Sequence, residues 1–167
     1  MARKYISVKS RGYKKNNWSH ENKGCAMTIG TTATNGLYQG GSIVVPADTN
    51  PGTRTVGKWT ITVPVHGGLS GVDVYWALVY VPQGTTANNL FSTTGSKEGS
   101  LYEPNQFVLA SGISDANAGP IRIRSNMMRK LHSNDFVSLI LGYQGDGASS
   151  IGNTAVTALV SYSIKYN

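Results

Sequence analysis

The chain is punctuated by short apolar runs, rich in Val, Ile, Thr and Tyr, that end at Gly, Pro, Asn or Asp. Runs of this kind are typical of β-strands separated by turns. No window has a helical period for more than two turns, although residues 127–132 fit a single helical turn. The runs predict eight strands, at residues 25–34, 37–46, 56–65, 72–82, 104–112, 119–125, 135–143 and 154–166.

Three of these runs also indicate how their side chains are oriented. Residues 59–65 alternate apolar and polar side chains, as a strand does when only one face meets a core. Residues 72–81 are apolar on both faces, which predicts a strand that is covered on both sides. In residues 121–124 the two isoleucines project to one face, so Arg122 and Arg124 project together to the other.

The connections between the strands favour one β architecture. Two of them are long, from Pro82 to Glu103 and from Ser111 to Gly119, which argues against an up-and-down barrel joined by short turns. A length of 167 residues fits one domain. We therefore predict an all-β fold, an eight-stranded antiparallel two-sheet jelly roll with a basic N-terminal arm.

Positive charge is concentrated at the N-terminus. Residues 1–24 hold seven basic side chains against Glu21, giving 7 − 1 = +6 of the net charge of +7, while residues 25–167 hold 8 basic and 7 acidic side chains, giving +1. The segment has few aliphatic residues and no regular period, so it cannot bury enough surface to offset the entropy of ordering. We predict an arm at 1–24 and a folded domain at 25–167.

The composition of the arm suggests what it binds. A cationic tail on a nearly neutral body is typical of binding to nucleic acid or to another anionic surface, and a merely solubilising terminus is the alternative. Tyr5, Tyr13 and Trp18 lie among the cations. This mixture offers both neutralisation of phosphates and stacking on bases.

A second basic cluster lies in the folded domain and comprises Arg122, Arg124, Arg129 and Lys130, with no acid among them. The planar guanidinium group suits the capture of phosphate or carboxylate, so the cluster is a candidate for contact with nucleic acid on a concave inner surface. Alternatively, it pairs with Glu98, Glu103 or Asp115 across subunits, or keeps an exposed strand soluble. No ladder of aromatic residues accompanies it, so we expect binding that is electrostatic and independent of sequence.

Catalytic and metal-binding patterns are missing from the sequence. His20, His66 and His132 lie far apart, the acids of the folded domain are scattered, and no phosphate-binding loop or nucleophile motif occurs. We therefore predict no enzyme, no catalytic residues, no bound metal and no cofactor. The lone Cys25 excludes an internal disulfide, and no apolar run approaches the roughly 20 residues that span a bilayer, so no membrane insertion is expected.

Four phrases of the sequence resemble the capsid proteins of small circular single-stranded DNA viruses that encode a rolling-circle replication protein. The phrases are Val79–Gly84, Gly99–Val108, Ala118–Ser125 and Leu131–Asp135, and the likeness covers roughly residues 55–145. The resemblance implies a single jelly-roll subunit that forms a small icosahedral shell of about sixty copies. It also implies that the arm and the inner surface face the genome.

The resemblance further implies which arm residues contact the genome, namely Arg3, Lys4, Lys9, Arg11, Lys14 and Lys15. The expected partner is single-stranded nucleic acid, with DNA favoured, and the expected location is the virion, with assembly in the host nucleus. This arm is shorter and less rich in arginine than those of many relatives, so the strand cluster or small cations must neutralise the remaining phosphates. The alternatives are a coat protein of a small RNA virus or satellite, and a lectin-like β-sandwich that does not assemble.

Overall fold

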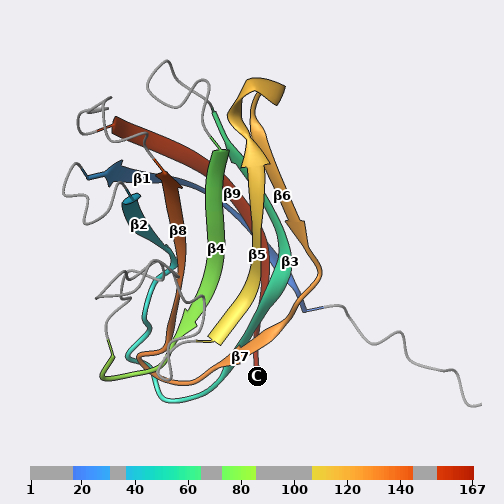
Figure 1. Cartoon of the computed structure of the whole chain (residues 1–167). Helices are drawn as coiled ribbons and strands as arrows, with labels where there is room; N and C mark the ends of the chain where they lie inside the picture. Colours follow the sequence, from blue (N-terminus) through green and yellow to red (C-terminus); the bar gives the residue numbers. More distant parts are fainter. Residues whose placement is uncertain (1–16, 31–36, 65–72, 86–106, 145–153) are drawn as a thin grey trace, which may run out of the picture.

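The computed structural model describes residues 17–30, 37–64, 73–85, 107–144 and 154–167. These residues form nine strands and one short 3₁₀ helix, which Figure 1 shows as two layers of strands. In chain order the elements are β1 (Ser19–Ile29), β2 (Leu37–Val45), β3 (Arg54–Val63), β4 (Asp73–Val81), β5 (Phe107–Asp115), η1 (Ala116–Ala118), β6 (Ile121–Ser125), β7 (Arg129–Leu131), β8 (Phe136–Gln144) and β9 (Thr154–Tyr166).

The strands form two antiparallel sheets. Sheet A has the order β1-β9-β3-β6, with β7 also paired to β3, and sheet B has the order β2-β8-β4-β5. The chain crosses repeatedly from one sheet to the other. Strands β1 and β9, which are the first and last strands in the described chain, pair with each other in sheet A. This is a jelly roll, so the predicted all-β fold of two antiparallel sheets is confirmed, although the described residues form nine strands where eight were predicted, the additional one being β7.

The core lies between the two sheets and is built from alternate residues of each strand. The largest side chains that are fully buried are Trp59, Tyr143, Ile29, Ile61, Leu78, Ile123, Leu131, Leu139 and Leu141. Each Ile or Leu side chain among them contributes about 1.5–3 kcal/mol relative to exposure. Strand β4 is covered on both faces, as predicted, because Val74 and Leu78 belong to this core while Ala77 and Val79 are buried in a second cluster with Ile140.

Two expectations about local structure are wrong. Residues 127–132 do not form a helical turn, because Arg129–Leu131 pair with β3 and bury Leu131 completely. The first strand begins at Ser19 instead of near residue 25. Its first six side chains are exposed, so the backbone ladder with β9 holds this end and hydrophobic alternation could not reveal it. The other seven predicted strands match to within three residues at each end.

Candidate nucleic-acid interface

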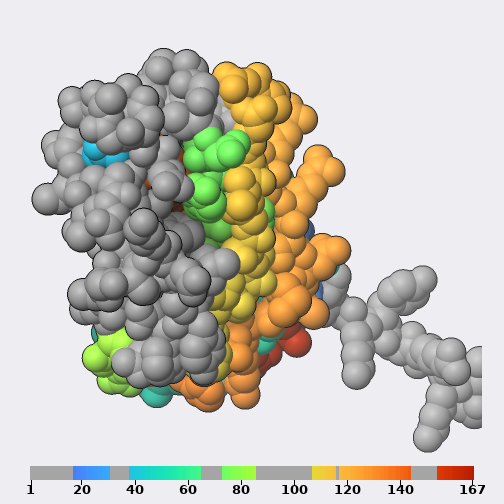
Figure 2. Space-filling model, viewed as in Figure 1, coloured from blue at the N-terminus to red at the C-terminus, as the bar shows by residue number. Residues whose placement is uncertain are grey.

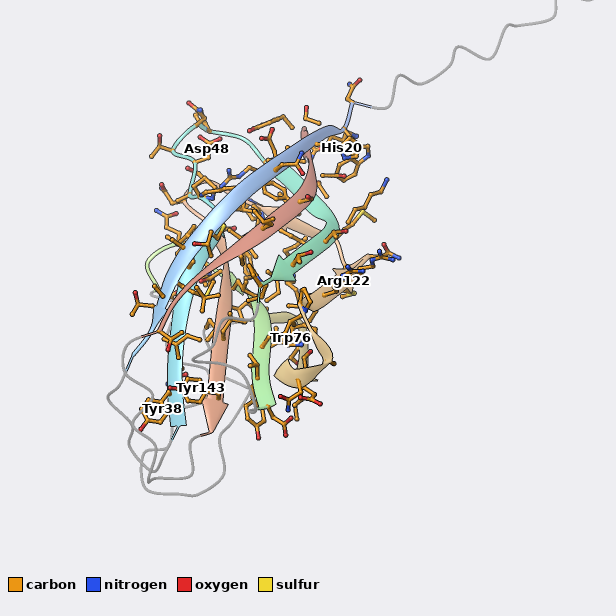
Figure 3. The ribbon with its side chains drawn as sticks, turned by 90° about the horizontal axis from the view of Figure 1, so that it is seen from above. His20, Tyr38, Asp48, Trp76, Arg122 and Tyr143 are labelled. Atoms are coloured by element: carbon orange, nitrogen blue, oxygen red, sulfur yellow. The ribbon has the colours of Figure 1, made fainter. Side chains whose placement is uncertain are left out.

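The outer face of sheet A, which points away from the core, carries the two arginines of residues 121–124, as the sequence pattern predicted. Ile121 and Ile123 of β6 are buried, and Arg122 and Arg124 between them are exposed, as predicted. Figure 3 shows Arg122 projecting away from the sandwich, and Figure 2 shows side chains of the orange segment that contains β6 protruding at the rim of the molecule. The two guanidinium groups are therefore accessible on one face of an edge strand.

Strand β3 aligns two further cations with these arginines. Arg122 lies opposite Thr62, Arg124 opposite Thr60 and Lys130 opposite Thr55. Lys130 is exposed between Arg129 and the buried Leu131, so it points away from the core. Lys58 is exposed on β3 itself, between these positions.

We call Arg122, Arg124, Lys58 and Lys130 the cationic track. It follows β3 from residue 62 to residue 55, which is roughly 20 Å at about 3.3 Å per residue.

Lys165 of β9 extends the charge of this face. Thr55 pairs with Lys130 on one side and with Lys165 on the other, so the two lysines flank one threonine on neighbouring strands. Sequence reasoning missed both Lys165 and Lys58. Alternation along 154–166 predicts that Lys165 points away from the core, because the neighbouring Ile164 points into it. Only the strand order shows that Lys165 lies near Lys130.

Arg129 is separated from the track, although the sequence grouped it there. Its guanidinium carbon lies 4.2 Å from the ring centroid of Tyr80 and 5.0 Å from that of Phe107. Its Nε atom is buried and has no hydrogen-bond partner among the described residues. Arg129 therefore bridges the two sheets at their open edge through stacking, a position that favours a structural role.

Acidic side chains do not neutralise the track within the described part of the chain. Glu21 is the one acid in the described strands of sheet A, and it lies opposite Tyr162, whose side chain is buried on the core side. Asp115, considered above as a partner for the arginines, accepts a hydrogen bond from the Asn117 backbone at 2.7 Å and caps η1. Glu98 and Glu103 lie outside the described residues.

The N-terminal segment joins the sandwich beside this track. Trp18 precedes β1, and Lys58 Nζ lies 5.8 Å from the centroid of its ring. His20, two residues further on, contacts Ser163 of β9 at 3.0 Å from Nδ1 to Oγ, and Figure 3 shows it where the chain enters the sheet. The predicted arm contacts Arg3, Lys4, Lys9, Arg11, Lys14 and Lys15 lie outside the described residues.

A buried carboxylate fixes the turn between β7 and β8, at the end of the track. Asp135 Oδ2 accepts hydrogen bonds from Tyr80 Oη at 2.8 Å and from the His132 backbone at 2.7 Å, and Oδ1 accepts one from the Gln83 backbone at 3.0 Å. Burial raises the pKa of Asp135, but these hydrogen bonds outweigh burial and lower it below its usual value. Burial, and the hydrogen bond to Asp135, raise the pKa of Tyr80.

The chemistry available elsewhere is limited. The described residues contain no group of three or more His, Cys, Asp or Glu side chains placed to hold a metal ion. The Ser163 hydroxyl beside His20 is buried, with 1% of the residue exposed, so a substrate cannot reach it as it would a catalytic serine. Within the described segments, no helix is long and apolar enough to cross a membrane.

Comparisons with known proteins add little to this geometry. No family model matches the chain, and no curated protein matches it. A solved structure named Desmodium yellow mottle tymovirus matches 91% of this chain and 89% of its own, with 11% sequence identity and a TM-score of 0.38. A likeness this weak carries no argument about function, so the viral family that the sequence resembles stays a prediction.

Proposed function

We propose that this chain is a viral coat protein, a jelly-roll subunit that assembles into a closed shell around single-stranded nucleic acid. The observation that carries the proposal is the cationic track, which lies on one face of sheet A beside Trp18, where the basic N-terminal segment meets β1. One continuous surface would then contact the genome through both the arm and the sheet.

Binding would occur through the release of counterions from phosphates, without reading of bases. Each subunit would contribute the six arm cations and five on the outer face of sheet A, namely the track and Lys165. Lys and Arg contacts to phosphate depend on salt and carry no sequence information. The face thus supplies some of the charge that the short arm lacks.

Assembly would use the remaining surface of the sandwich. Ile43 on β2 and Phe107 and Ile113 on β5 are exposed apolar side chains of sheet B, and residues 25–167 are nearly neutral overall. Such surface suits contacts between copies, with closure at about sixty subunits. The sequence resemblance favours DNA as the cargo and the host nucleus as the site of assembly, while the track itself suits RNA equally well.

A lectin-like function has less support. Trp76, the aromatic residue considered for a sugar site, donates a hydrogen bond from Nε1 to Ser114 Oγ at 3.2 Å, and its ring closely approaches Gly112 of β5. The indole is therefore engaged within sheet B. Asp146, the other residue considered, lies outside the described residues.

Electron microscopy of the purified recombinant protein, combined with its ratio of absorbance at 260 and 280 nm, tests the proposal. We expect uniform spheres with a raised ratio, and digestion with DNase or RNase after disassembly would identify the cargo. Deletion of residues 2–15 is expected to preserve folding and to lower the nucleic-acid content. A protein that stays monomeric at high concentration and binds no nucleic acid would contradict the proposal.

A further inference from the structure

A β-bulge in β3 gives Lys58 an unusual backbone conformation. The pairing with β9 shifts between Gly57, opposite Ser163, and Thr60, opposite Ser161. Lys58 lies in this bulge with a φ angle of 56°, in the left-handed region that side chains with a Cβ disfavour. Bulges commonly redirect a side chain, and local strain of this kind concentrates at functional positions.

The bulge separates Lys58 from its neighbour Trp59. Trp59 turns into the core, where 1% of it is exposed, and its Nε1 donates a hydrogen bond to the Met127 carbonyl at 3.0 Å. Lys58, in contrast, is exposed on the outer face of sheet A, and its ammonium group lies near the Trp18 ring. The strained conformation therefore adds a cation between Arg124 and Lys130, where regular alternation would leave a gap.

Trp18 differs from the other two tryptophans. Trp59 and Trp76 donate indole hydrogen bonds to Met127 and Ser114, respectively, whereas the structure gives no such acceptor for Trp18 within its described part. Trp18 is also only half-buried, outside the core. A large aromatic ring that lies at the surface beside a cation is suited to stack on a base.

The geometry points to a base-stacking site: we infer that Trp18 stacks on an unpaired base while Lys58 and its track neighbours bind the adjoining phosphates, so that the protein prefers single-stranded to duplex nucleic acid. This inference rests on the proposed function and makes it more specific. Bases in a duplex are stacked on one another, so their faces are not available to Trp18, whereas every base of a flexible single strand offers one.

Titration of the dissociated full-length protein with oligo(dT), and with a duplex of equal length, tests the role of Trp18. Trp18→Leu is expected to weaken single-strand binding about 5- to 150-fold and to change duplex binding less than about 2-fold. Trp18→Phe, which retains a ring, should recover most of the affinity. Oligo(dT) should quench the fluorescence of the wild-type protein more than that of Trp18→Phe.

Lys58→Gly separates a binding role from a structural one. Glycine adopts a φ angle of 56° without steric strain, so this variant should be at least as stable as the wild type. Its single-strand affinity should nevertheless fall, and the slope of log affinity against log salt should decrease by about one. An unchanged slope would show that Lys58 makes no phosphate contact and would overturn its assigned role.

The outcomes distinguish this inference from the proposed function. If Trp18→Leu retains wild-type affinity and strand preference while Arg122→Gln/Arg124→Gln weakens binding, the stacking site is wrong and the proposed function stands. If the wild-type protein binds neither single strands nor duplex, the proposed function itself fails.

Discussion

The hydroxyl group of Tyr80 donates a hydrogen bond to Asp135 Oδ2 at 2.8 Å, and this bond connects β4 to the turn that precedes β8. The same turn follows Lys130, the last cation of the track. A single buried carboxylate thus holds the strand end that presents this lysine.

Replacement of Asp135 by Asn should destabilise the fold. Both carboxylate oxygens accept hydrogen bonds, so an amide would direct its NH₂ group at existing donors. We expect a loss of about 1–3 kcal/mol in the free energy of unfolding, measured with urea at pH 7. Tyr80→Phe removes one donor and should cost less, about 0.5–1.5 kcal/mol. Equal stability of Asp135→Asn and wild type would contradict the assignment.

The pKa of Asp135 also predicts a dependence on pH. Its folded-state pKa lies below the usual value of 3.8, so its contribution is complete above that value and is lost as the pH falls through the folded-state pKa. The unfolding free energy of the wild type should therefore fall more steeply below this pH than that of Asp135→Asn. Parallel acid-unfolding curves for the two proteins would argue against a stabilising charged carboxylate.

Gly40 lies where β2 approaches β1 too closely for any side chain. A Cβ atom at this position would collide with the Thr28 carbonyl oxygen. Gly40→Ala is therefore expected to cost at least about 1–3 kcal/mol by overpacking, measured by thermal or urea unfolding. Gly24→Ala is a matched control, because its Cβ would lie 3.7 Å from the nearest atom, Thr157 Cγ2. Similar losses in the two variants would show that this close approach is not responsible.

Arg122→Gln combined with Arg124→Gln should reduce nucleic-acid binding without affecting the fold. Both side chains are exposed, so the change in unfolding free energy should stay within about 0.5 kcal/mol. The salt slope of oligonucleotide binding should fall by about two. Lys23→Gln provides a control, because Lys23 lies opposite the buried Val160 and reaches the Ile43 carbonyl, away from the outer face. If the salt slope of Lys23→Gln falls by the same amount, the cationic track does not contribute more to binding than other surface lysines.

Arg129→Ala should give the opposite result. Loss of stacking on Tyr80 and Phe107 is expected to cost about 0.5–2 kcal/mol of stability, while the salt slope should not change. The measurement pairs urea unfolding with the same binding titration. If Arg129→Ala instead lowers the salt slope and leaves stability unchanged, Arg129 contacts phosphate and does not have a structural role.

The sequence pattern predicted the strands because most of them have one buried and one exposed face. Ile121, Arg122, Ile123 and Arg124 illustrate this, since alternation alone gave their orientation. The beginning of β1 escaped prediction because Ser19 to Gly24 are all exposed, so no alternation of buried and exposed positions marks them. Backbone pairing with β9 and polar side-chain contacts such as that of His20 with Ser163 hold this end instead. Strand β7 was missed because three residues are too few to show a period.

The candidate site was predictable only in part. The clustering of Arg122 and Arg124 is local in sequence, and the structure retains it. Lys58, Lys165 and Trp18 come from three separate segments that meet through strand order and a bulge, and neither is visible as a pattern along the chain. Arg129 stands beside Lys130 in sequence yet faces the other way, because neighbouring residues of a strand point to opposite sides.

The pairing of β1 with β9 affects the order of events during biosynthesis. Ser19 meets Ile164, and Ile29 meets Thr154, so β1 has no hydrogen-bonded strand partner until residues 154–166 have left the ribosome. Contacts this distant in sequence are slow to form. Trp18, which directly precedes β1, therefore reaches its place beside Lys58 only after β9 has been made, so in the proposed function this site would be completed late in folding.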